Sequence, residues 1–142
     1  MSEHPPIRSE AFEAKLVHAR PMSSSVREMI FERADGSPVR FEPGQWFNLM
    51  VPKHDGGEAK RAYSISSPPS GDARFELAVT RLEGGEASAR LHEMPVGRTV
   101  RAIGPSGLFT RLPDETTSAL VVGTGTGITP LRSMLLAATS RP

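Results

Sequence analysis

Apolar and polar residues alternate in short runs through the first part of the chain. The clearest run covers residues 74–81, where Phe75, Leu77 and Val79 alternate with Glu76, Ala78 and Thr80. A period of two places one set on each face of a strand, so this run predicts a strand with one buried face and one solvated face. Similar short runs rich in β-branched or aromatic residues predict five more strands, over residues 14–19, 26–32, 45–51, 61–66 and 98–103.

Turn residues separate these runs. The chain has 13 glycines and 13 prolines, spread between the runs rather than clustered. Short strands at such spacing are typical of an antiparallel barrel or sandwich. Residues 34–38 predict a hairpin turn, and one short helix is expected over residues 88–94, ended by Pro95.

The pattern changes after about Thr110. Residues 119–122 are uniformly apolar, which predicts a buried strand of the parallel kind, and a glycine turn over residues 123–127 follows. A helix is expected from about residue 128, with Pro130 in its first turn. Its apolar face is predicted to carry Ile128, Leu131, Leu135 and Ala138. A strand, a glycine turn and a helix open a nucleotide-binding α/β domain.

Length and composition narrow the class of protein. With 142 residues the chain suits one domain plus part of a second, expected as a flexible leader (1–10), a barrel (11–112) and the first βα unit (113–142). The absence of cysteine excludes disulfides, thiolate metal sites and a cysteine nucleophile, and the four histidines show no metal-ligand spacing, so no metal site is expected. A net charge of +1 excludes the basic footprint of a nucleic-acid-binding protein. Without a long apolar run or a signal peptide, a cytoplasmic protein with no membrane span is expected.

The strand at residues 61–66 carries the first candidate site. Arg61 and Tyr63 are expected on one face and Ser64 on the other. A guanidinium can bind a phosphate through two donors, and the ring of Tyr63, the one tyrosine of the chain, can cover a planar aromatic ligand. An ordinary edge strand with an exposed arginine would show the same tetrapeptide.

Two glycine segments are candidate phosphate sites. Residues 84–88 precede the first predicted helix, and residues 123–127 precede the second. A helix N-terminus presents free N–H groups and a positive dipole end to an anion. The first segment also fits a hairpin turn with Ser88 as a helix N-cap, and the second fits a tight turn without a ligand. Residues 123–128 complete neither the G-x-G-x-x-G pattern nor a P-loop.

The order of these motifs resembles the ferredoxin–NADP reductase family. Arg-x-Tyr-Ser (61–64) is followed by Gly-Gly-x-x-Ser (84–88), Gly-Pro-Ser-Gly (104–107) and Gly-Thr-Gly-Thr-Gly-Ile-Thr-Pro (123–130). The resemblance implies a mainly β fold, a six-stranded antiparallel Greek-key flavin-binding barrel followed by an α/β domain for NAD(P)H.

The resemblance also assigns roles to single residues. It implies that Arg61 pairs with the flavin phosphate, that Tyr63 packs on the isoalloxazine, and that Ser64 hydrogen-bonds near flavin N5. Tyr63 and Ser64 are therefore the expected catalytic residues. The further cofactor-binding residues that it implies are Ala62 beside this pair, Leu77, Ala78 and Val79 along the ribityl and adenosine side, Gly85, Glu86, Ala87 and Ser88 at the pyrophosphate of FAD, and Thr124, Gly125, Thr126 and Gly127 at the pyridine nucleotide.

The implied function is that of a flavin-dependent NAD(P)H oxidoreductase. Electrons would pass from NAD(P)H through FAD to a ferredoxin, a flavodoxin or an oxygenase component. FAD is favoured over FMN by the pyrophosphate loop, although Ser88-x-x-Leu91-His92-Glu93 also resembles FMN-using dioxygenase reductases. Because residues 113–142 supply one strand and one helix, the sequence is expected to be part of a longer reductase or a flavin half completed by another chain. The alternative is a flavin-binding module without its own NAD(P)H turnover.

Overall fold

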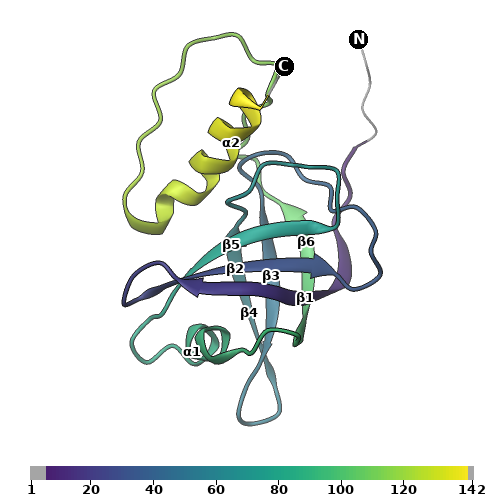
Figure 1. Ribbon diagram of the computed structural model, residues 1–142, viewed down its shortest axis with the longest axis vertical. Coiled ribbons are helices and arrows are strands. Elements are labelled where there is room, and N and C mark those ends of the chain that lie inside the picture. Colours follow the sequence, from purple (N-terminus) through teal and green to yellow (C-terminus); the bar gives the residue numbers. More distant parts are fainter. Residues whose placement is uncertain (1–5, 141–142) are drawn as a thin grey trace.

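The computed structural model describes residues 6–140, so residues 1–5 of the predicted leader lie outside the described residues. Residues 6–140 form six strands, two α-helices and one short 3₁₀ helix (Figure 1). Their bounds are β1 Glu10–Pro21, β2 Val26–Arg33, β3 Trp46–Pro52, β4 Glu58–Ser64, β5 Arg74–Thr80, α1 Glu86–Glu93, β6 Thr99–Ser106, η1 Gly125–Ile128 and α2 Thr129–Thr139.

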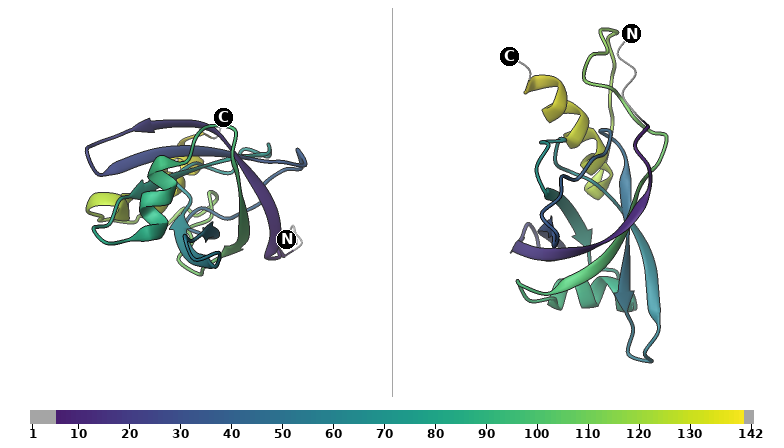
Figure 2. Two further views of the ribbon diagram at one scale, coloured as in Figure 1. Left: turned by 90° about the horizontal axis from the view of Figure 1, so that it is seen from below. Right: turned by 90° about the vertical axis from the view of Figure 1, so that its right-hand side faces the viewer.

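The six strands form one antiparallel sheet in the order β4-β3-β6-β1-β2-β5. The sheet curls until its outer strands approach each other, and an antiparallel bridge between Ile65 and Leu77 joins the chain just after β4 to β5 (Figure 2). The predicted mainly β fold with six antiparallel strands is confirmed, and each of the six strands predicted before residue 110 overlaps an observed one.

The alternating pattern of β5 is confirmed by its burial. Phe75, Leu77 and Val79 are fully buried, while the residues between them are half-buried. Phe75 lies at the centre of an aromatic cluster, with its ring centroid 4.8 Å from that of Phe47 and 5.6 Å from that of Phe31. Burial of such large side chains is the main source of the barrel's stability.

Helix α1 lies across one end of the barrel and α2 lies at the other (Figures 1 and 2). Helix α1 begins at Glu86, and its N-cap is Gly85 with no side-chain cap hydrogen bond. The prediction of Ser88 as the N-cap was therefore wrong, because Ser88 lies within the first turn, where its hydroxyl holds the preceding loop instead.

The prediction of a buried strand over residues 119–122 was wrong. These residues have no regular secondary structure and no strand partner among the described residues, and Leu120 and Val122 are exposed. A parallel strand of this kind needs neighbours on both edges. The described part of the chain supplies one helix at this place and no second parallel strand.

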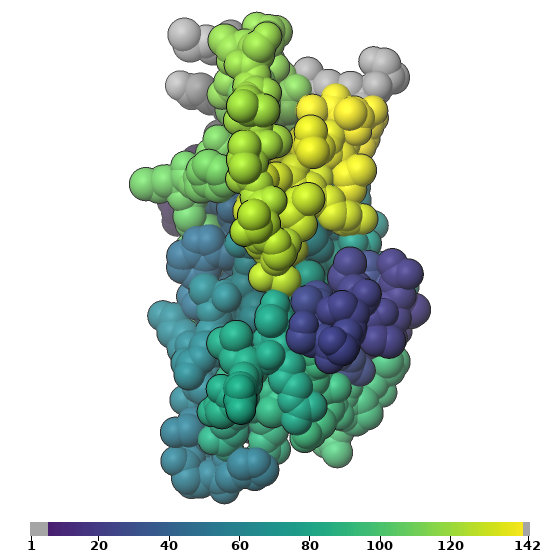
Figure 3. All heavy atoms as spheres, turned by 90° about the vertical axis from the view of Figure 1, so that its left-hand side faces the viewer, coloured from purple at the N-terminus to yellow at the C-terminus, as the bar shows by residue number. Residues whose placement is uncertain are grey.

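The second helix was predicted correctly in position but only partly in the face it buries, because Leu131 is buried as expected whereas Ala138 is exposed. Helix α2 buries Leu131 and Met134, together with Thr129 and Ser133, whereas Ile128 and Leu135 are exposed. The barrel side that receives α2 presents backbone carbonyls as well as apolar groups, so small hydroxyl side chains are buried there. Figure 3 shows α2 in yellow above the teal chain around α1.

The backbone at Gly44 lies very close to the chain after β6, at Phe109, and to Met134 of α2. Gly44 has φ = 106°, and a Cβ built there would lie 1.8 Å from the carbonyl oxygen of Phe109 and 2.7 Å from the terminal methyl of Met134. Only glycine fits both this conformation and this spacing. Among residues 6–140, no helix is long and apolar enough to cross a membrane.

Candidate functional site

A cavity of about 470 Å³ gathers residues from all the predicted flavin motifs. Four elements line it: the end of β4, the outer face of β5, the start of α1 and the glycine turn before α2. The lining residues are Arg61, Ala62, Tyr63, Ser64, Ala78, Thr80, Leu82, Gly85, Ala87, Ser88, Thr126, Gly127 and Thr129. Cavities of a few hundred cubic ångströms with convergent polar groups are typical small-molecule sites.

Strand β4 brings Arg61, Tyr63 and Ser64 to this cavity together. Ser64 was expected on the opposite face, but it is the last residue of β4, and it reaches the cavity wall as the strand ends. Arg61 is exposed, and its hydrogen bond is to the Lys60 carbonyl at 2.9 Å. Within residues 6–140, Arg61 has no acidic partner, so its charge is free to meet an anion.

Tyr63 presents a neutral ring to the cavity. Partial burial raises the pKa of its phenol above the ordinary value of 10.0, and the positive charge of Arg61 opposes this shift in part. Burial disfavours the phenolate because a charged group loses solvation in a low-dielectric environment. Tyr63 therefore offers an uncharged aromatic surface over the physiological pH range.

Strand β5 contributes different side chains from those that the motif suggested. Leu77 and Val79 are fully buried in the core, so only their backbone could contact a ligand, whereas Ala78 lines the cavity. Thr80 lines it too, and sequence reasoning missed this residue. The alternation of β5 could have found it, because Thr80 shares the face of Ala78.

The loop before α1 is held in shape by Ser88. Its hydroxyl accepts a hydrogen bond from the Leu82 amide at 2.9 Å and donates one to the Gly85 carbonyl at 3.2 Å. Gly85, Ala87 and Ser88 line the cavity. The Glu86 carboxylate turns away and accepts a hydrogen bond from the His54 amide at 2.5 Å. The first turn of α1, whose N–H groups have no partner within the helix, therefore lies at the cavity, and the Glu86 carboxylate does not line it.

The glycine turn before α2 reaches the cavity at Thr126 and Gly127. The hydroxyl of Thr80 donates to the hydroxyl of Thr126 at 3.4 Å, a contact between β5 and the turn. Thr124 and Gly125 do not line this cavity. Gly125 instead lines a smaller apolar cavity of about 220 Å³ on the other side of Thr126.

A second groove of about 720 Å³ adjoins the cavity at Leu82 and Gly85, which line both. Its charged wall comes from the hairpin between β3 and β4, from the end of β5 and from α1. The charged and histidine residues along it are His54, Arg81, Glu83, Glu86, Arg90 and Glu93. Arg90 Nη2 lies 2.8 Å from His54 Nδ1, a contact that joins the hairpin to α1 at this groove.

Comparison with known proteins identifies the family. The oxidoreductase FAD-binding domain family matches residues 13–110, so the chain belongs to this family. The resemblance to ferredoxin–NADP reductases is confirmed by ferredoxin–NADP reductase B of Sorangium cellulosum (strain So ce56), which is 60% identical over 131 residues, covering 92% of this chain and 53% of that protein.

Two further similarities extend this finding. The ferredoxin reductase component of a 3-ketosteroid-9-alpha-monooxygenase from Mycolicibacterium smegmatis (strain ATCC 700084 / mc(2)155) is 31% identical over 135 residues, covering 91% of this chain and 38% of that protein. The structure of an Amycolatopsis cytochrome P450 reductase superposes with a TM-score of 0.81 at 28% identity, covering 99% of this chain and 43% of that chain. The chain thus spans about half the length of the Sorangium reductase and a smaller share of the other two proteins.

Proposed function

We propose that this chain binds FAD in the cavity between β4, β5, α1 and the glycine turn, as the flavin-binding part of an NAD(P)H-dependent oxidoreductase. One observation carries the proposal: a cation that pairs with no acidic residue within residues 6–140, a neutral aromatic ring and a helix N-terminus all line one cavity of about 470 Å³. A flavin nucleotide needs these three features for its phosphate, its ring system and its pyrophosphate.

The phosphate-binding roles follow from charge. The Arg61 guanidinium is exposed at the cavity and can donate two parallel hydrogen bonds to a phosphate. The N–H groups of Glu86, Ala87 and Ser88 point out of the first turn of α1, whose positive dipole end favours a pyrophosphate. The Ser88 hydroxyl supports this second site indirectly, because it holds Leu82 and Gly85 in place.

The residues beside the reacting ring are Tyr63 and Ser64. The neutral Tyr63 ring can stack on one face of an isoalloxazine and exclude water from it. Within residues 6–140 the Ser64 hydroxyl has no hydrogen-bond partner, so it is available near N5. FAD, when bound, supplies a centre that accepts two electrons as a hydride and can release them one at a time.

The adjoining groove supports FAD over FMN. FMN ends at its phosphate and would leave the groove beyond Gly85 empty. The AMP half of FAD has a second phosphate and a base that can enter a groove of about 720 Å³. Arg90 lines this groove and can balance phosphate charge, whereas Arg81 already pairs with Glu93 at 3.5 Å.

We further propose NAD(P)H as the hydride donor and an electron-carrier protein or oxygenase component as the acceptor. Thr126 and Gly127 place the glycine turn at the same cavity, where a nicotinamide nucleotide would meet the flavin. Thr124 and Gly125 would contact its pyrophosphate from the same turn. Ferredoxin, flavodoxin and oxygenase components remain the candidate acceptors, because the relatives include both a ferredoxin–NADP reductase and an oxygenase reductase component.

The alternative is a flavin-binding module without NAD(P)H turnover of its own. The observation that favours it is the exposed segment 119–122, which pairs with no strand within residues 6–140, because a dinucleotide domain binds its ligand at the edge of a paired parallel sheet. Flavin binding is common to both proposals.

The test is a titration of the purified 142-residue chain with FAD and, separately, with FMN, followed by mixing with NADPH or NADH. We expect a bound-flavin absorption spectrum with FAD, weaker binding of FMN, and bleaching of the flavin if the chain accepts hydride. Flavin binding without bleaching would support the module. No binding of either flavin would refute both proposals.

A further inference from the structure

Within residues 6–140, side-chain contacts rather than sheet pairing join α2 to the barrel. Between the end of β6 at Ser106 and the start of η1 at Gly125, the chain has no helix or strand. Residues 119–122 pair with no strand within the described residues. In the described part of the chain, the contacts that α2 makes with the barrel hold it in place.

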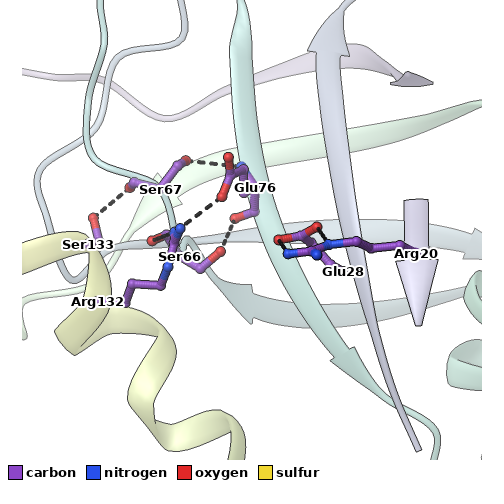
Figure 4. A network of polar contacts seen from close by, with 7 residues as sticks. All are labelled: Arg20, Glu28, Ser66, Ser67, Glu76, Arg132 and Ser133. Carbon is purple, nitrogen blue, oxygen red and sulfur yellow. Dashed lines mark hydrogen bonds and ion pairs between the residues drawn. The ribbon is translucent and has the colours of Figure 1, made fainter. Parts of the chain in front are cut away.

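A polar cluster, which we name the α2 clamp, makes these contacts (Figure 4). It consists of Ser66, Ser67 and Glu76 on the barrel and Arg132 and Ser133 on α2. The Arg132 Nη1 donates to the Ser66 carbonyl at 2.8 Å and lies 3.1 Å from Glu76 Oε2. The fully buried Ser133 hydroxyl donates to the Ser67 carbonyl at 2.7 Å.

The barrel side of the clamp is held independently of α2. The Ser66 amide donates to the Glu76 carbonyl at 2.9 Å, and the Glu76 amide donates to the Ser67 hydroxyl at 3.0 Å. These bonds tie residues 66 and 67 to β5 whether or not α2 is docked. The barrel residues of the clamp, Ser66, Ser67 and Glu76, thus form an anchor for the two side chains from α2.

The anchor adjoins the flavin site. Ser66 lies two residues after Ser64, and the glycine turn that precedes α2 lines the same cavity at Thr126 and Gly127. Displacing α2 along the barrel would therefore change the distance between Ser64 and the turn. A reacting group moved by about 1 Å can lose about a hundredfold in rate.

We propose that Arg132 and Ser133 are positioning residues that set the distance between the glycine turn and the flavin strand. The expected effect on flavin reduction rests on the proposed function, whereas the docking of α2 by Arg132 and Ser133 does not. Leu131 and Met134 bury apolar surface at the same interface and favour contact of the helix with the barrel. Apolar burial has no direction, whereas the two hydrogen bonds to carbonyls specify one register.

The first arm of the test measures the docking of α2 without flavin. Because the chain has one tryptophan and no cysteine, Ala138→Cys creates a single labelling site on the exposed side of α2 for energy transfer from Trp46. We expect Arg132→Gln combined with Ser133→Ala to lower the transfer, and Arg132→Lys alone to retain part of it. Arg74 lies on β5, the strand of Glu76, and forms an exposed ion pair with Glu32. Arg74→Gln removes this pair and should leave the energy transfer unchanged. Unchanged transfer in the double variant would overturn the proposal.

The second arm uses the FAD-loaded chain and rapid mixing with NADPH. We expect the double variant to bind FAD within about threefold of the original affinity. The limiting rate of flavin reduction should fall about tenfold or more at an unchanged half-saturating concentration. An undocked helix with an unchanged limiting rate would overturn the positioning role. If the original chain takes up no FAD, the proposed function fails, but the energy-transfer measurement still tests whether Arg132 and Ser133 dock α2. If FAD binds but is not reduced, the energy-transfer measurement alone tests the proposal.

Discussion

Arg27 and Leu91 join β2 to the end of α1. The Arg27 Nη1 donates to the Leu91 carbonyl at 2.6 Å and to the Met94 carbonyl at 2.9 Å. The last carbonyls of a helix have no partner within it, so a guanidinium there satisfies them and complements the negative dipole end. Since the opposite end of α1 lines the cavity, Arg27 holds in place the helix that we propose binds pyrophosphate.

Replacing Arg27 by leucine is expected to lower the free energy of unfolding by about 1–3 kcal/mol, because half-buried carbonyls lose a charged donor. Urea unfolding followed by Trp46 fluorescence measures the change. Arg20→Gln is the matched control: it removes an arginine that pairs with Glu28 at the surface, and such pairs contribute about 1 kcal/mol or less. Equal effects of the two changes would contradict the helix-capping role of Arg27.

Gly44 is expected to tolerate no side chain. Gly44→Ala places a Cβ against the Phe109 carbonyl and the Met134 methyl in a conformation that disfavours side chains. We expect a loss of about 3 kcal/mol or more, since a clash adds to a backbone cost of about 1–3 kcal/mol. Gly36→Ala is the control, because Gly36 also has positive φ, at 73°, but faces open space. A Gly44→Ala variant no less stable than Gly36→Ala would show that the close approach is not required.

Tyr63 can be titrated alone because it is the one tyrosine in the chain. The phenolate absorbance of the folded protein should have its midpoint above 10.0, since burial raises the pKa of Tyr63. The protonated phenol is favoured in the folded state, so this contribution to stability is present below the ordinary pKa and is lost as the pH rises through the folded pKa. Tyr63→Phe should abolish the signal. A midpoint at or below 10.0 in protein shown to be folded would contradict the burial of the ring.

Asp35 is expected to govern part of the acid stability. A hydrogen bond from the Arg33 guanidinium, followed by the Ser37 amide, lowers the pKa of Asp35 to about 2 from its ordinary 3.8. The folded state favours the carboxylate, so the contribution is present above 3.8 and is lost as the pH falls from 3.8 towards 2. We expect Asp35→Asn to lower the Tm at pH 5 and to have little effect at pH 2. A Tm difference that is the same at both pH values would contradict this assignment.

The barrel could be predicted from the sequence because its signal is local. The alternation of Phe75, Leu77 and Val79 follows from the period of a half-buried strand. The motif at residues 61–64 could likewise be placed on a strand, but the predicted strand, residues 61–66, put it at the start, whereas it lies at the end of β4, Glu58–Ser64. Residues 119–122 were mispredicted because a buried parallel strand depends on partners elsewhere in a chain, which no local pattern reveals.

The supporting residues could not be predicted. Arg27 and Arg132 look like ordinary surface arginines in the sequence, and their partners are backbone carbonyls more than 60 residues away. Every residue has a backbone carbonyl, so the sequence does not indicate which carbonyl will accept a hydrogen bond from a distant side chain. Ser133 similarly becomes a buried donor only because the barrel presents the Ser67 carbonyl to it. Thr80 is the exception, since the strand period places it beside Ala78.

The most direct test of the proposed flavin site is the affinity of the chain for FAD after Arg61→Ala, with the neighbouring Lys60→Ala as control. Both residues are exposed cations on β4, but only Arg61 lines the cavity. A charge-assisted phosphate contact contributes about 1.5–3 kcal/mol, so Arg61→Ala should raise the Kd for FAD about 10-fold to 150-fold. Lys60→Ala should leave the Kd within about threefold. An unchanged Kd in Arg61→Ala, or an equal rise in both variants, would contradict the placement of the flavin phosphate in this cavity.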